Sequence, residues 1–157
     1  MRGMRGIFGS VAVRRGLAVG AVLAVFAGAV TWLYDGGLLP DAAQAVEFLV
    51  LLVGFSVAGA LAARVTGQTS SGAFAGLVAS LLGGGVILGA SVVWAIVAPG
   101  LFAGSVGYHQ HVATIQLVGV ALARSAAGLI MWAVLGGGLG ALGGMMGKRS
   151  GEPKSSR

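Results

Sequence analysis

The chain has no cysteine, and among its 157 residues it has only four acidic side chains and three prolines. The absence of cysteine excludes disulfides and thiolate ligands for a metal. Two histidines and four acids do not assemble a nucleophile, a base and a group that orients the base. The sequence also lacks a Gly-rich phosphate loop after a strand and an HExxH motif. We therefore expect a protein that is not an enzyme, with no catalytic residues, no metal and no cofactor.

Charge is scarce as well, because Asp, Glu, Lys and Arg together make up 9% of the chain. Hydrophobic residues make up 57% and the mean hydropathy is +0.95, so the polar side chains are too few to coat a water-soluble globule of this size. In hydrocarbon the backbone must satisfy its own hydrogen bonds, which leaves helices or closed barrels. The uncharged runs here have the length of helices, so the sequence predicts an all-α, polytopic membrane protein.

Four apolar runs predict four transmembrane helices within a membrane domain over 17–146. We expect the helices at about 17–34, 42–63, 72–98 and 125–146, joined by polar or Gly-containing turns. Residues 1–16 are predicted to be a basic leader, and 147–157 a disordered basic tail. A cleaved signal peptide is the alternative for the first run, but the run continues past the small residues 27–29 to Trp32 and Tyr34.

The last apolar region, 112–146, is longer than one span needs and contains Arg124. In the preferred placement the helix begins at Ser125 and 112–123 forms a short interfacial or re-entrant piece. In the alternative the helix begins near Ile115 and carries Arg124 into the bilayer, at a cost of about 2.5–3.5 kcal/mol.

The charges indicate an orientation for this four-span arrangement. Nine of the ten basic residues, all but Arg124, fall on the side of the two termini, and three of the four acids fall on the other side. The positive-inside bias therefore predicts a multi-pass protein of the cell membrane with both termini cytoplasmic. Topology accounts for the net charge of +6, so we expect the basic ends to contact anionic lipid and not nucleic acid.

Small residues recur at every fourth position in three of the runs. They form ladders at Gly72, Gly76, Ser80 and Gly84, at Gly16, Gly20, Ala24 and Gly28, and at Gly136, Gly140 and Gly144. Such faces let membrane helices approach closely. They predict an antiparallel, Gly-rich bundle, with homo-oligomerisation through one ladder as the alternative. The triplets Gly83–Gly85 and Gly136–Gly138 further predict local weakness in their helices.

Two charged residues lie inside or beside apolar runs and are the candidate binding residues. Glu47 is about one helical turn from the outer end of the second run, and Arg124 lies near the outer end of the fourth. They predict either a charge pair near the interface or an ion site. His109 and His111 alternate in a loop, but two ligands alone do not make a metal site.

These observations leave two function classes open. The first is a small multi-pass membrane protein of structural or accessory role, built on close small-residue packing of its helices. The second is a small oligomeric transporter or channel in which Glu47 is the ion- or proton-coupled residue.

Overall fold

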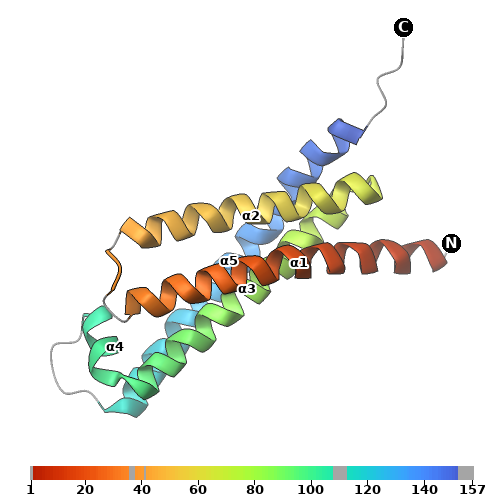
Figure 1. Ribbon diagram of the computed structural model, residues 1–157. Helices are drawn as coiled ribbons and strands as arrows, with labels where there is room; N and C mark the ends of the chain where they lie inside the picture. The colour runs from red at the N-terminus through yellow and green to blue at the C-terminus, as the bar shows by residue number, and fades with distance from the viewer. Residues whose placement is uncertain (1, 36–37, 41, 108–112, 152–157) are drawn as a thin grey trace, which may run out of the picture.

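The computed structural model describes residues 2–35, 38–40, 42–107 and 113–151, and over these residues the chain is helical without any strand. The helices are α1 (Arg2–Asp35), α2 (Ala42–Thr66), α3 (Thr69–Val97), α4 (Pro99–Ser105) and α5 (Thr114–Gly151) (Figure 1). Four segments are long and apolar enough to cross a membrane: Val11–Tyr34, Ala42–Thr66, Thr69–Val97 and Thr114–Gly147. The predicted all-α class and the predicted four helices of spanning length are confirmed.

The turn between α2 and α3 is short because Gly67 ends α2 in a left-handed conformation, with φ at +67°. Its N–H donates to the carbonyl oxygen of Ala63 at 2.7 Å, and the Thr66 hydroxyl donates to the carbonyl oxygen of Ala62 at 3.0 Å. These bonds satisfy backbone carbonyls that the helix end would otherwise leave without donors. The chain therefore reverses within two residues and enters α3 at Thr69.

The structure differs from the preferred placement of the last helix. α5 is continuous from Thr114 to Gly151, so residues 114–123 of the expected interfacial piece 112–123 belong to the helix, and Arg124 lies inside it; Val112 lies outside the described residues. The described part of this region has no proline to break the helix. The Arg124 side chain is exposed on the surface of the bundle. At the other terminus, α1 begins at Arg2, and the predicted leader is part of that helix.

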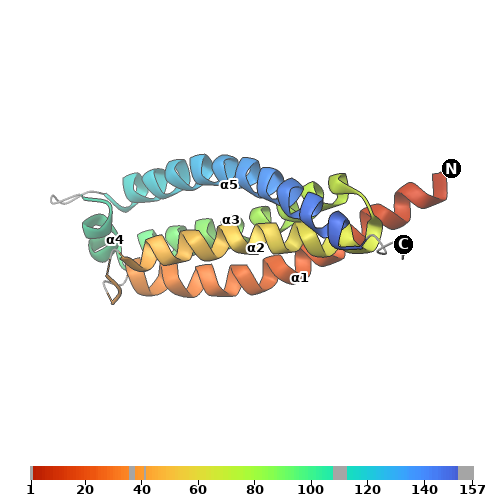
Figure 2. The same cartoon turned by 90° about the horizontal axis from the view of Figure 1, so that it is seen from above.

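The short helix α4 was not predicted. α3 ends at Val97 because Pro99 has no backbone N–H and disfavours helical geometry at Ala98. Pro99 instead begins α4, where its restricted φ suits the first helical turn. The seven residues of α4 lie across the end of the bundle remote from the start of α1 and the end of α5 (Figures 1 and 2).

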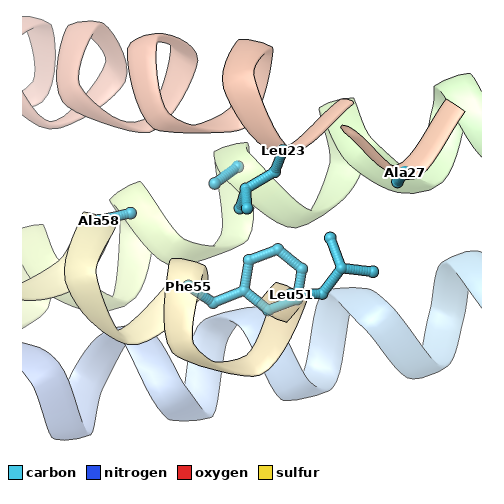
Figure 3. Close-up of a cluster of buried hydrophobic side chains, with 6 residues drawn as sticks. Leu23, Ala27, Leu51, Phe55 and Ala58 are labelled. Atoms are coloured by element: carbon cyan, nitrogen blue, oxygen red, sulfur yellow. The ribbon is translucent and has the colours of Figure 1, made fainter. Parts of the chain in front are cut away.

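α3 contacts every other helix, and α5 curves across α2 and α3 (Figure 2). A central apolar cluster includes Leu23 and Ala27 of α1, Leu51 and Phe55 of α2, and Ala79 of α3. Figure 3 shows Leu23 directed from α1 toward the ring of Phe55. Much of the remaining apolar surface is exposed, including Val22 at 69% and Val134 at 70%.

Glycines bring the backbones of neighbouring helices into contact. A Cβ atom added at Gly76 of α3 would overlap the carbonyl oxygen of Gly136 and would lie 2.8 Å from the Cα of Gly140, both in α5. A Cβ at Gly20 of α1 would lie 2.9 Å from the Cα of Ala79. The ladder over 72–84 thus faces α5 of the same chain, and α1 packs on another side of α3. Both glycine triplets are helical throughout, so neither unwinds its helix.

Candidate functional site: a polar cavity beneath α4

The two candidate charges line one cavity, although they come from different helices. Glu47 lies five residues after the start of α2, about 7 Å along the helix, and Arg124 lies ten residues after the start of α5, about 15 Å along it. The cavity has a volume of about 380 Å³ and is bordered by all five helices. The size is within the usual range of sites for small molecules.

The polar groups of the cavity come from the four long helices. They provide hydroxyl, amide, carboxylate and guanidinium groups, from Thr31, Tyr34, Gln44, Glu47, Ser91, Arg124 and Ser125. Together these side chains can donate and accept hydrogen bonds and present one charge of each sign. The arrangement can hold a small molecule that has both polar and charged groups.

Aromatic side chains border the end of the cavity nearer the middle of the helices. The ring of Trp132 lies 5.3 Å from that of Phe48, and it meets Phe55 edge-on at a centroid distance of 5.8 Å. These rings connect α2 with α5. On the α3 side, Gly84 lines the cavity, and a Cβ placed there would lie 2.8 Å from Cδ2 of Leu129. The polar cavity therefore ends at these aromatic rings and at the close contact of Gly84 with Leu129.

Helix α4 covers the other end of the cavity. Phe102 lines it and is 3% exposed, because the ring packs in a second apolar cluster with Ala95, Leu117 and Ala121. This cluster joins the end of α3 to the start of α5. Phe102 thus separates the polar cavity from the surface of the bundle at this end.

The close backbone contacts of α5 with its neighbours lie in its C-terminal half. Gly140 and Gly144 pack on α3, and Gly143 packs against the Ser56 carbonyl of α2. In the N-terminal half, a Cβ at Gly119 or Gly128 would have no neighbour within 4 Å. Near α4 the helix instead contacts α3 and α4 through side chains such as Leu117 and Ala121, and the cavity is lined by α5 residues from Ala121 to Trp132.

The sequence identified two of the polar lining residues and missed the others. Glu47 and Arg124 share the cavity, while their direct pairing stays a prediction. Gln44 precedes Glu47 by three residues, which places both on one face of α2 and is a signal that the sequence contained. Ser91 and Ser125 are isolated hydroxyls in apolar runs, so nothing nearby in the sequence related them to Glu47.

His109 and His111, the two histidines considered as metal ligands, lie outside the residues that the structure describes. Among the residues that the structure describes, no group of three or more His, Cys, Asp or Glu side chains is placed to hold a metal ion.

No family model, curated protein or solved structure matches this chain. Its functional interpretation therefore depends on the cavity and on the packing that surrounds it.

Proposed function

We propose that this chain is a multi-pass protein of the cell membrane with a structural or accessory role, and that it is not an enzyme. The observation that carries the proposal is that four helices of spanning length expose large apolar side chains such as Val22 and Val134. Exposed apolar surface of this extent requires an apolar environment. The proposed scaffold is an antiparallel, Gly-rich bundle, which the backbone contacts of Gly76 and Gly140 support.

The proposed orientation has both termini in the cytoplasm. The start of α1, the end of α2 and the end of α5 lie at the same end of the bundle (Figure 1). The exposed Arg14 and Arg15 are in the first half of α1 and the exposed Arg64 is in the last turn of α2, so all three lie toward this end. Arg124 lies toward the opposite end. The positive-inside bias favours the Arg-rich end as the cytoplasmic one.

The proposed partners are the bilayer itself and anionic lipid at the basic ends, with no role for nucleic acid. Homo-oligomerisation stays open as an alternative. The glycine ladders do not favour it, because Gly20, Gly76 and Gly140 all contact other helices within the chain.

Single-cysteine labelling tests the membrane location and the orientation, and the absence of cysteine provides a clean background. In intact cells, a membrane-impermeant maleimide should label Leu38→Cys and Ala113→Cys, both exposed toward the α4 end. Gln68→Cys, in the α2–α3 turn, should react only after permeabilisation. The reverse pattern would overturn the orientation, and loss of the protein from membranes on alkaline extraction would overturn the location.

The cavity favours a second candidate function, a small oligomeric transporter or channel coupled through Glu47. An intramembrane carboxylate that lines a polar cavity is a common feature of proton- and cation-coupled sites. Flux of a polar probe into proteoliposomes, driven by a proton gradient, should fall in Glu47→Gln if this candidate is correct. Equal flux in the wild type and in Glu47→Gln, or in the wild type and in protein-free liposomes, would exclude it.

A further inference from the structure

A second hollow continues the line of the polar cavity along α2 and α5. It is an apolar groove of about 340 Å³, and its lining includes Leu52, Ser56 and Ala60 of α2 and Leu139 and Gly143 of α5. The one hydroxyl of this lining is satisfied locally, because Ser56 Oγ donates to the carbonyl oxygen of Leu52 at 3.1 Å. The groove therefore offers an apolar surface, in contrast to the cavity.

The two hollows lie on the same face of α2. Gln44 and Phe48 line the cavity, and Leu52, Ser56 and Ala60 continue the series at four-residue spacing in the groove. Residues four apart lie one above another on a helix. The groove covers about 12 Å of α2 beyond the cavity.

α5 shows the same succession. Arg124, Gly128 and Trp132 line the cavity, and Leu139 and Gly143 line the groove farther along the helix. The seam between α2 and α5 thus changes from charged to apolar with distance from the α4 end.

The polar cavity opens along this seam. Its exposed lining residues all belong to α2 and α5: Gln44, Phe48 at 39%, Arg124 and Met131 at 48%. The lining residues from α1, α3 and α4 are buried or partly buried. In a bilayer, a side opening between two spanning helices faces lipid.

We infer that the α2–α5 seam binds one zwitterionic phospholipid, with its phosphate and ammonium groups in the polar cavity and part of an acyl chain in the groove. The inference rests on the proposed membrane location. The head lies toward the α4 end, and the groove for the chain crosses the middle of α2 and lies beyond the middle of α5. This is the direction of a lipid in the adjacent leaflet.

The charges of the cavity match both halves of such a headgroup. The Arg124 guanidinium can donate paired hydrogen bonds to phosphate oxygens, and the Glu47 carboxylate can accept from an ammonium group. An isolated cation or anion would be attracted by one of these residues and repelled by the other. A headgroup with both charges satisfies both.

Native mass spectrometry of the full chain from non-ionic detergent tests this inference. The probes are phosphatidylethanolamine, phosphatidylglycerol and diacylglycerol with identical chains, each added at an equal molar ratio. The wild type should retain one phosphatidylethanolamine about ten-fold more than diacylglycerol, because diacylglycerol lacks both charges. Equal retention of the three lipids would overturn the site.

Three variants separate the contributions of head and chain. Arg124→Gln should lose retention of both phospholipids, and Glu47→Gln should shift the preference from phosphatidylethanolamine to phosphatidylglycerol. Val57→Trp should fill the groove and lower retention of all chains. Val134→Trp is the matched control, because Val134 is exposed and lines neither hollow.

The outcomes distinguish this inference from the proposed function. If Arg124→Gln and Val57→Trp retain phosphatidylethanolamine like the control, the lipid site is overturned, and an ion pair or a wet cavity accounts for the charges. If these proteins also stay in membranes on alkaline extraction, the membrane location stands without the lipid site. Release of the wild type on extraction would overturn both.

Discussion

Gly76 of α3 and Gly140 of α5 lie so close that a Cβ atom added to Gly76 would be 2.8 Å from the Cα of Gly140. The neighbouring contact of Gly76 with the carbonyl oxygen of Gly136 is closer still. A backbone cannot move aside as the end of a flexible side chain can. The α3–α5 contact therefore requires glycine on both helices.

We predict that Gly76→Ala lowers the free energy of unfolding by about 1–3 kcal/mol, and that Gly76→Leu disrupts folding, because both force α5 away from α3. Gly85→Ala is the matched control, since a Cβ at that exposed position has no neighbour within 4 Å. It should leave stability unchanged or raise it by up to about 1 kcal/mol, because alanine favours the helix over glycine. Thermal unfolding in detergent measures both, and an unchanged Gly76→Ala would mean that α3 and α5 do not pack as described.

The α2–α5 contact depends on Gly143 in the same way. A Cβ at Gly143 would overlap the carbonyl oxygen of Ser56, so Gly143→Ala should destabilise the protein by a similar amount. Gly138→Ala, five residues earlier and without a neighbour within 4 Å, should have little effect. The same unfolding assay compares the two, and equal midpoints would contradict the contact.

Glu47 and Arg124 should be coupled in stability. Each single change to Gln leaves the opposite charge in the cavity without its counterpart, so each should destabilise the protein. The double variant should lose less than the sum of the single losses, by at least about 0.5 kcal/mol. Strictly additive losses in a double-mutant cycle would show that the two groups do not interact.

Phe102 should hold α4 over the cavity. Phe102→Ala removes a buried ring that packs on Leu117 and Ala121, and it should cost about 3–5 kcal/mol if the site cannot collapse. The neighbouring Leu101 is exposed, so Leu101→Ala should cost much less. Phe102→Ala should also raise the accessibility of a cysteine at Ser91 to maleimide. Unchanged labelling would mean that α4 does not close this end.

The sequence alone determined the all-α class and the number of helices that are long and apolar enough to cross a membrane. Run length and charge are local properties, because a helix in hydrocarbon needs about 20 apolar residues whatever its neighbours are. The reversal of the chain at Gly67 also follows from local sequence, because a connection this short can join only antiparallel neighbouring helices. The sequence did not predict α4, because its seven residues are too few to show a helical repeat of apolar side chains.

Only the tertiary structure decided how far α5 extends and what its charge does. From the sequence, the free-energy cost of a charge in the bilayer favoured a helix that begins after Arg124. In the structure, Arg124 lies inside a continuous helix and lines a cavity. That cavity depends on how the faces of all five helices pack together. The fourfold ladders predicted faces suited to contact, but they did not show that a Cβ at Gly76 would overlap α5 whereas one at Gly128 would have no neighbour within 4 Å. Small residues permit close approach without specifying a partner, so the packing of the whole bundle selected which glycines touch and which border the cavity.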